Sequence, residues 1–352
     1  MSEPERPELA IARYRQALKT VPDKKARYGL LLGLAGAQAD AGWFEEAVDS
    51  CREAIEADAD NHAGFAMLAT VLLDQGQITD ASEAAFQALK RAPDDPATLN
   101  LATGVALRRG LAEAARKLSV ACLTRSPTDQ RALAHHAIAL AQLGRDVEAK
   151  HLIDFDHLLK IDSPPPPPGF ASIEVFNRVV VEALTGRTDL NTRHVARTLV
   201  GGSRLENTFA LDAPVADALR GMFTQATHDY AAELVVTADH PMVKGKPGAF
   251  KISSWANIMD GTAYELPHMH PGSWLSGVYY PEIGAPAEGT EGGAIEFGGH
   301  DFGAAFTAAG PTRRVMPHAG MLVLFPSYFY HRTLPLDVPG RRISIAFDAT
   351  AT

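Results

Sequence analysis

Two histidines separated by one residue, His268 and His270, stand in the segment LPHMHPGSWLSGVYY, which has the composition of a β-strand. Alternate residues of a strand point to one face of the sheet, so the two imidazoles are expected to project together. Neutral imidazole nitrogen is a good ligand for iron, zinc or copper. The pair therefore indicates a candidate metal site, although two polar residues near a surface would give the same pattern.

Two later segments carry residues that could complete such a site. His331 lies in FPSYFYHRTLP, and strands this far apart in sequence become neighbours when a sheet rolls up. In GRRISIAFD, Arg342 and Ser344 share one face of a predicted strand. A buried arginine beside a hydroxyl is suited to hold a carboxylate with two hydrogen bonds. The alternative for Arg342 is a solvated charge at a strand edge.

Taken in order, these segments resemble the C-terminal core of the 2-oxoglutarate/Fe(II) oxygenases, in particular the branch in which H-x-H-P runs into S-G-V-Y-Y. The resemblance covers roughly residues 248–350. It implies a double-stranded β-helix, Fe(II) and O2 as cofactors, and 2-oxoglutarate as co-substrate. It also implies that His268 and His331 bind the metal, that Arg342 binds the far carboxylate of 2-oxoglutarate, and that Ser344 assists it.

The middle metal ligand departs from the usual pattern of two histidines and one carboxylate, because His270 stands at the carboxylate position. His270 binds as a third ligand, or it lies beside a metal held by two histidines and water, or a distant carboxylate, Glu265 or Asp301, replaces it. A regular strand would turn Glu265 to the wrong face. We predict His268, His270 and His331 as the catalytic metal ligands.

Several further residues are expected near the co-substrate. Tyr279 and Tyr280 follow the histidines on an adjoining strand, so one of them should face the pocket. Asn257, Ser276 and Trp274 are candidates to line it. We predict cofactor contacts for Tyr279, Asn257 and Ser276, with packing or strand pairing as the alternative role of each.

The N-terminal half of the chain repeats with a period of 34 residues. Gly42, Gly76, Gly110 and Gly144 keep this spacing, and an alanine follows each glycine by five residues. The period predicts stacked helical hairpins, in which glycine ends one helix and alanine allows close helix contact. The array resembles tetratricopeptide repeats over about residues 30–155. Such arrays bind a peptide or protein in a concave groove or mediate homodimer formation. An array that only supports the second domain is the alternative.

Five consecutive prolines in SPPPPPG, residues 163–169, favour an extended linker. We therefore predict a tetratricopeptide-type helical domain over 1–162 and an oxygenase-like domain over 170–352. Helices are expected at 172–185 and 212–235. Strands are expected at 249–259, 263–270, 274–280, 293–297, 313–317, 320–325 and 342–348. The predicted fold is α followed by α+β, with a C-terminal double-stranded β-helix (jelly roll) flanked by helices.

Composition limits the other partners. The net charge of −9 lacks the basic footprint of a nucleic-acid-binding protein. No apolar run reaches the roughly 18 residues of a membrane span, and the N-terminus has no secretory signal pattern. Cys51 and Cys122 fall within repeats and are interpreted as small buried residues. A cytoplasmic protein that binds neither nucleic acid nor membrane is expected.

The leading hypothesis is a 2-oxoglutarate-dependent non-haem iron dioxygenase that hydroxylates a peptide or protein side chain, or a small molecule. One alternative is a three-histidine iron dioxygenase that does not use 2-oxoglutarate. Arg342 and Ser344 disfavour it, because such an enzyme has no dicarboxylate to hold. The other alternative is a non-catalytic repeat scaffold. The joint presence of His268, His331 and Arg342 disfavours that one.

Overall fold

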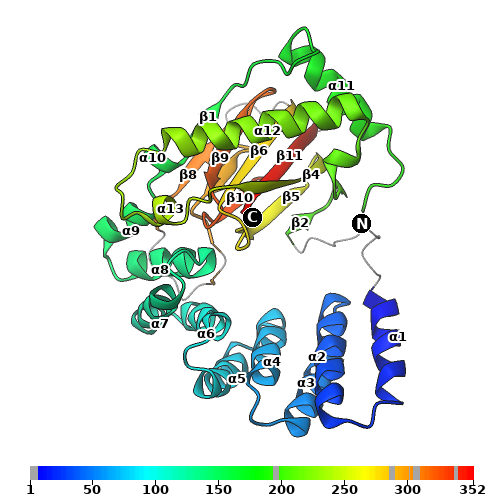
Figure 1. Cartoon of the computed structure of the whole chain (residues 1–352), viewed down its shortest axis with the longest axis vertical. Coiled ribbons are helices and arrows are strands. Elements are labelled where there is room, and N and C mark those ends of the chain that lie inside the picture. Colours follow the sequence, from blue (N-terminus) through cyan, green and yellow to red (C-terminus); the bar gives the residue numbers. More distant parts are fainter. Residues whose placement is uncertain (1–6, 193–197, 285–289, 301, 304–309, 337–339) are drawn as a thin grey trace. The chain divides into compact units, whose positions relative to one another are not determined.

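A computed structural model describes residues 7–192, 198–284, 290–300, 302–303, 310–336 and 340–352 of the chain. The chain forms two compact units. The first is Met1–Pro127 with Phe302–Thr307, and the second is Thr128–Asp301 with Ala308–Thr352. Figure 1 shows helices in the first unit and strands with covering helices in the second. Each unit is described by itself.

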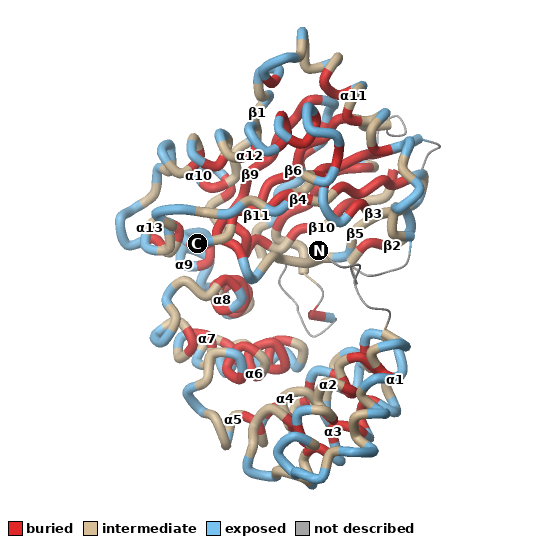
Figure 2. The backbone as a smooth tube through the Cα atoms, turned by 45° about the vertical axis from the view of Figure 1, so that its right-hand side comes forward, coloured by how far each residue is buried: buried red, intermediate tan, exposed pale blue. Residues whose placement is uncertain are grey.

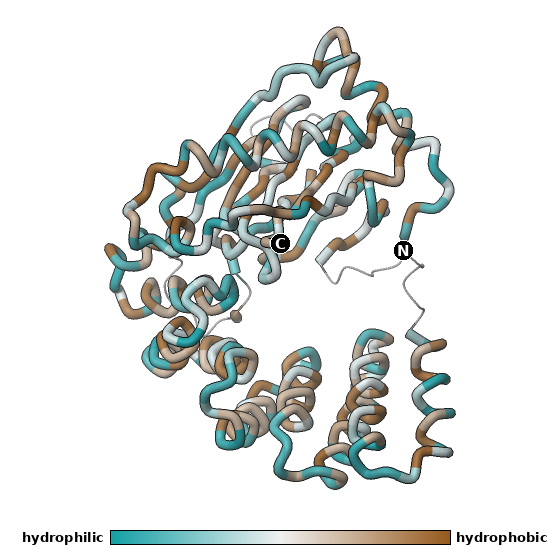
Figure 3. The backbone as a smooth tube through the Cα atoms, viewed as in Figure 1, coloured by the Kyte–Doolittle hydropathy of each residue, from teal (hydrophilic) through white to brown (hydrophobic). Residues whose placement is uncertain are grey.

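Helical hairpins make up the first unit. Helix α1 (Pro7–Leu18) comes first. The hairpins that follow it are α2 (Lys24–Asp40) with α3 (Phe44–Ala57), α4 (His62–Asp74) with α5 (Ile78–Arg91), and α6 (Pro96–Arg108) with α7 (Ala112–Arg125). A further hairpin of the same period, α8 (Gln130–Gln142) with α9 (Asp146–Leu152), belongs to the second unit. Apolar and polar segments alternate along these helices, as expected when one face of each is buried (Figure 3).

The repeated residues do what their spacing predicts. The glycines at 42, 76, 110 and 144 have φ between 68° and 78°, the left-handed conformation that ends a helix. The alanines at 47, 81, 115 and 149 are at most 1% exposed, so each contact between the helices leaves room for only a methyl group. The predicted tetratricopeptide-type repeats are therefore confirmed.

Two antiparallel sheets form the centre of the second unit, as far as the chain is described. Sheet A has the order β1 (Lys160–Asp162), β9 (Leu322–Pro326), β6 (Leu275–Ile283), β11 (Arg341–Ala351), β4 (Phe250–Asp260) and β3 (Ser203–Leu205). Sheet B has the order β2 (Leu199–Val200), β5 (Tyr264–His268), β10 (His331–Thr333), β7 (Ile295–Phe297) and β8 (Arg313–Val315). From β4 to β11 the chain passes back and forth between the sheets, which is the winding of the predicted double-stranded β-helix.

Helices cover one face of sheet A. Phe223 of α12 (Ala213–Glu233) stacks on Phe347 of β11 with ring centroids 4.3 Å apart. Tyr279 of β6 donates a hydrogen bond to Asn177 of α11 (Ile173–Thr185). Figure 1 shows α12 lying along the strands, and Figure 2 shows β6 and β9 as largely buried. Odd-numbered residues of β11 therefore face helices, which leaves even-numbered residues such as Arg342 on the opposite, inner face.

The expected elements of the second unit agree with the structure apart from their ends. Both predicted helices and all seven predicted strands are present, and β10 and the short strands β1 to β3 are additional. The strand expected at 263–270 ends at His268, because Pro271 and Gly272 lie in a turn. The remaining short helices are α10 (Phe155–Leu158), η1 (Thr208–Ala210) and α13 (Pro241–Lys244). None of the helices in the described ranges has the length and apolar composition needed to cross a membrane.

The compact units divide earlier than the polyproline segment. Strand β1 lies directly before the prolines and already pairs with β9 of sheet A. Phe155 of α10 packs edge-on against Phe329, with ring centroids 5.4 Å apart. Because these contacts hold residues 128–162 to the sheets, this stretch belongs to the second unit.

Candidate metal centre and co-substrate site

The three predicted histidines converge. One ring nitrogen from each of His268, His270 and His331 lies within 4.8 Å of the other two, and no other His, Cys, Asp or Glu of the described residues forms such a group. His331 on β10 is the direct partner of His268 on β5. His270 follows in the turn, where its backbone N–H donates to the carbonyl of Ser327 at 2.9 Å. The His270 imidazole therefore reaches the site from the segment that follows β5, although the sequence pattern predicts it on the strand itself.

Each imidazole is held through its Nδ1 atom. His268 and His331 each donate to the backbone carbonyl two residues earlier, at 2.7 and 3.0 Å. His270 donates to the carboxylate of Asp348 at 2.7 Å. Carbonyl and carboxylate oxygens only accept, so each Nδ1 carries a hydrogen, and in a neutral ring Nε2 then keeps a free lone pair. This arrangement orients three imidazole donors, a set that fits Fe(II).

Burial keeps two of these imidazoles neutral. Removal from water lowers the pKa of His268 and brings the pKa of His331 well below its ordinary value, and the neighbouring imidazoles lower the pKa of His331 further. His331 is 6% exposed, whereas His268 is partly open to solvent. A neutral ring is the form that binds a metal ion.

We expect the metal-free protein to lose stability as the pH falls below 6.5, the ordinary pKa of histidine. Because the folded-state pKa of His331 is depressed, the unfolded chain then binds a proton that the folded protein does not bind. Each such proton lowers the free energy of unfolding by about 1.4 kcal/mol per pH unit. Denaturant unfolding in EDTA at about pH 7.5 and about pH 5.5 measures the loss. The same loss in His331→Ala would contradict the assignment.

Glu265 lies beside the histidines after all. Strand β5 has one residue more than β10 between the pairs His331–His268 and Thr333–Glu265, and this bulge breaks the regular alternation. Burial lowers the pKa of His268, and the negative charge of Glu265 partly offsets this by raising it. The Glu265 carboxylate accepts from Asn257 Nδ2 at 3.0 Å and lies 3.4 Å from the Arg204 guanidinium, so it is engaged outside the histidine group. Asp301, the other carboxylate considered, lies outside the described residues.

Arg342 is a buried cation that pairs with no carboxylate of the described residues. It is 2% exposed. Its guanidinium donates to the carbonyl of Gly293 at 2.6 Å and to the Tyr280 hydroxyl at 3.3 Å, while its Nε has no partner. A buried charge without a counter-ion is destabilising. The unpartnered Nε therefore fits a carboxylate of 2-oxoglutarate, and Ser344 lies two residues further on the same strand face, also 2% exposed.

Tyr280, not Tyr279, faces this site. Tyr279 is the cross-strand partner of Ile345, so both lie on the face covered by helices, and the Tyr279 hydroxyl is bonded to Asn177. Tyr280 faces the other way and meets Arg342, whose Cζ lies 5.0 Å from its ring centroid. Tyr279 therefore points away from Arg342, and Tyr280, the other member of the pair considered, is the one that contacts it.

Tyr280→Phe is expected to raise the KM for 2-oxoglutarate about two- to tenfold, because Arg342 loses a hydrogen bond that orients it. Tyr279→Phe removes a buried hydrogen bond to Asn177. It should lower the free energy of unfolding by about 1 kcal/mol and leave this KM unchanged. Steady-state kinetics and denaturant unfolding of both variants test the pair, and the reverse pattern would contradict the assignment.

The other predicted residues have different surroundings. Ser276 donates to Asp348 at 2.6 Å and lies 3.2 Å from His270 Nδ1, so it lies behind the histidines. Asn257, the cross-strand partner of Ser344, accepts from Arg204 at 2.7 Å. Trp274 is not in the site, because its Nε1 donates to the carbonyl of Met242 within the core.

Asp348 is the functional candidate that the sequence reasoning missed. It lies at an even position of β11, on the same face as Arg342 and Ser344. Extending that alternation by four residues beyond Ser344 would have found it.

Solvent reaches this face between Ser344 and Asp348. Ala346 and its cross-strand partner Trp255 are partly exposed, although both lie in the middle of sheet A. The Trp255 ring lies 5.4 Å from that of His270, so solvent reaches the inner face beside the histidines.

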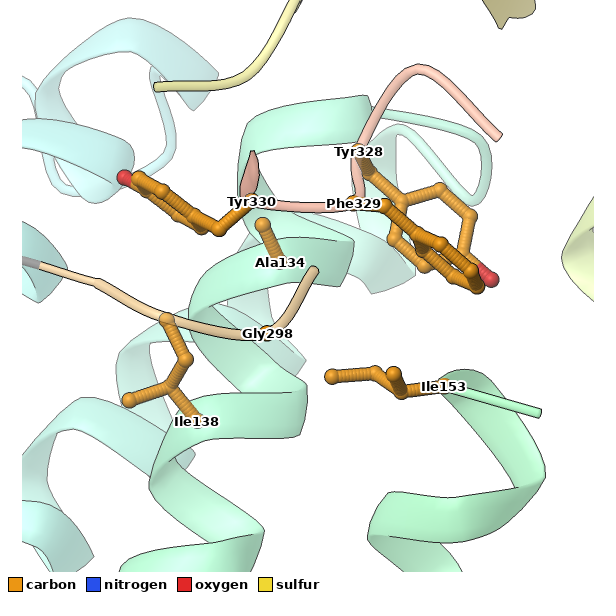
Figure 4. A pocket seen from close by; sticks show the side chains of 7 residues that line it. All are labelled: Ala134, Ile138, Ile153, Gly298, Tyr328, Phe329 and Tyr330. Carbon is orange, nitrogen blue, oxygen red and sulfur yellow. The ribbon is translucent and has the colours of Figure 1, made fainter. Parts of the chain in front are cut away.

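A hollow of about 250 Å³, including its open side, lies beside helix α8 (Figure 4). It is lined by Ala134 and Ile138 of α8, by Ile153, by Gly298, and by residues 328–330. None of the predicted site residues lines it. Its connection to the site is the backbone of Phe329, whose carbonyl accepts from His331.

Comparison with known proteins gives one family match and several structural neighbours. Residues 253–348 match a family described as "Putative 2OG-Fe(II) oxygenase". A prolyl-4-hydroxylase of Pseudomonas putida is 16% identical, with a TM-score of 0.40 over 60% of this chain and 99% of that one. A Trichoplax adhaerens prolyl hydroxylase, solved with a hypoxia inducible factor peptide fragment, is 13% identical, with a TM-score of 0.40 over 59% and 92%. YrrB, a TPR protein with an unusual peptide-binding site, is 21% identical, with a TM-score of 0.36 over 42% and 75%. Among curated proteins, none matches the chain.

The matched segment begins within β4 and ends within β11. It therefore contains the three converging histidines and the buried Arg342, whose donor sets fit Fe(II) and a dicarboxylate. Residues 253–348 are therefore a domain of the 2OG-Fe(II) oxygenase family, the 2-oxoglutarate-dependent dioxygenases that use Fe(II), 2-oxoglutarate and O2.

Proposed function

We propose that His268, His270 and His331 together hold the iron of this domain through their Nε2 atoms, and that Arg342 binds the far carboxylate of 2-oxoglutarate. The observation that carries the proposal is the convergence of three imidazoles whose Nδ1 atoms are all occupied by acceptors. Three imidazoles fixed in this way offer a preorganised metal site. Bound Fe(II), with 2-oxoglutarate and O2, would supply the oxidising chemistry.

The protein's own residues would bind and orient the reactants. Arg342 offers a buried positive charge, and Tyr280 and the Gly293 carbonyl hold its guanidinium in place. Ser344 and Asn257, which face each other across β11 and β4, would line the co-substrate. The partly exposed strip at Ala346 and Trp255 is the side from which a substrate would approach.

We further propose that the substrate is a side chain of a peptide or protein, which the helical repeats would bind in their groove. Repeat arrays of this kind present extended concave surfaces to such ligands. Oxidation of a small molecule is the alternative. A cytoplasmic location and a homodimer are part of the same proposal. Cys51 and Cys122 are both buried and are not joined in a disulfide, which suits a reducing compartment.

The test is turnover of 2-oxoglutarate by the purified full-length chain. Protein is incubated with Fe(II), ascorbate and 2-oxoglutarate, and succinate is followed, first alone and then with a peptide library. We expect slow succinate formation that a substrate peptide accelerates. If neither condition yields succinate although the protein binds Fe(II), the enzyme does not use 2-oxoglutarate.

A further inference from the structure

Among the three imidazoles, only that of His270 donates to a charged group. Its Nδ1–H meets Asp348 Oδ1 at 2.7 Å, whereas His268 and His331 donate to backbone carbonyls. A hydrogen bond to a carboxylate makes an imidazole a more basic and more anionic ligand than a bond to a neutral oxygen does. His270 therefore differs electronically from the other two.

Asp348 is dedicated to this contact. Its side chain is 14% exposed and that of His270 is 13% exposed, and no lysine or arginine of the described residues forms an ion pair with it. The Ser276 hydroxyl donates to the same Oδ1 at 2.6 Å. Since the hydrogen of Ser276 points to Asp348, Ser327 is the donor in its 2.8 Å contact with Ser276. A largely buried carboxylate whose partners are one imidazole and one hydroxyl is left with its charge uncompensated.

Backbone hydrogen bonds of three chain segments fix the positions of Asp348 and His270. Asp348 on β11 and Ser276 on β6 are direct cross-strand partners. The carbonyl of Ser327, which follows β9, accepts from the backbone N–H of His270 at 2.9 Å. Asp348 and Ser276 are thus positioned by neighbouring strands of sheet A, and His270 is tied by its backbone to the residue that follows a third strand of that sheet, β9.

We propose that Asp348 supplies, through His270, the negative charge that a directly bound carboxylate supplies at a site with two histidines and one acid. The inference rests on the three-histidine metal site proposed above. Asp348 is then a positioning residue with an electrostatic effect. The charge of the site falls from +2 toward +1 before 2-oxoglutarate arrives, so the metal binds without depending wholly on its co-substrate.

The experiment compares metal binding with and without co-substrate. Metal-free full-length protein is titrated with Co(II), followed by its visible absorption, in the absence and in the presence of saturating 2-oxoglutarate. Asp348→Asn keeps an oxygen to accept from His270 and removes the charge. We expect it to weaken Co(II) binding about 10- to 100-fold without 2-oxoglutarate. The loss should be clearly smaller with 2-oxoglutarate, because the dianion then provides the missing charge.

Two further variants separate charge from orientation. Ser276→Ala keeps the Asp348 charge and removes one hydrogen bond to it. The Co(II) affinities measured with and without 2-oxoglutarate can therefore both fall, but the ratio between them should match that of wild type. Glu282→Gln removes a carboxylate of the same sheet that pairs with Arg341, and it should change neither affinity. Circular dichroism of the metal-free variants checks folding. If Asp348→Asn does not fold, the Ser276→Ala ratio remains the test.

Three results would overturn the proposal. Equal weakening by Asp348→Asn in both conditions would make Asp348 an orienting group only. No weakening would remove its role altogether. A raised affinity ratio in Ser276→Ala would show that the ratio does not report the charge. Failure of wild type to bind Co(II) would instead overturn the metal site itself, so the two failures are distinguishable.

Discussion

His331→Ala is expected to abolish detectable Fe(II) binding and to lower succinate formation by at least about a hundredfold, more than loss of an outer contact to a metal ligand costs. His331 is the most buried of the three histidines and the strand partner of His268, so its loss leaves no third His, Cys, Asp or Glu of the described residues at ligand distance. Calorimetric Fe(II) titration under anaerobic conditions and the succinate assay measure the two effects.

The matched control is His318→Ala. His318 is exposed and lies outside the histidine group, so its replacement should change neither quantity. Retained Fe(II) affinity in His331→Ala would contradict the three-histidine site. Equal losses in both variants would show that the assay does not report this site.

Arg342→Met is expected to raise the KM for 2-oxoglutarate about a hundredfold or more, because loss of one partner of a buried charge pair costs about 2–5 kcal/mol in binding. The same change should not destabilise the protein without ligand. Removing a buried guanidinium that lacks a carboxylate partner and replacing it with an apolar chain of similar length is often neutral or stabilising.

Two measurements separate binding from folding. In wild type, 2-oxoglutarate at about 100 times its Kd, with metal present, should raise the free energy of unfolding by about 2.7 kcal/mol, and Arg342→Met should lose this gain. Arg341→Met is the control, since Arg341 is partly exposed and pairs with Glu282. If the stabilisation by 2-oxoglutarate is kept in Arg342→Met but lost in Arg341→Met, then Arg341 and not Arg342 binds the co-substrate.

Local chemistry made much of the fold predictable. The repeats follow from glycines with positive φ and alanines with no room for more than a methyl group, both of which act over a few residues. The strands of the second unit follow from apolar alternation between glycines and prolines. His268, His331 and Arg342 could be singled out because their spacing and flanking motifs resemble those of the 2-oxoglutarate/Fe(II) oxygenases.

The pairing between strands determines which face of the sheet some side chains point to, and alternation along a single strand does not predict this. A bulge in β5 turns Glu265 to the side of His268, and the shifted register of β6 places Tyr279 opposite Ile345 and turns Tyr280 inward. Position in a sequence specifies a strand face only while the strand is regular, because one extra residue reverses every later side chain.

By itself the sequence determined the two kinds of architecture, and it indicated the three histidines that converge and the arginine that is buried. Tertiary structure alone decided that β1, directly before the prolines, joins sheet A and that Asp348 meets His270. These contacts join segments dozens of residues apart through specific cross-strand registers. Register depends on the packing of whole sheets, and no single segment encodes it.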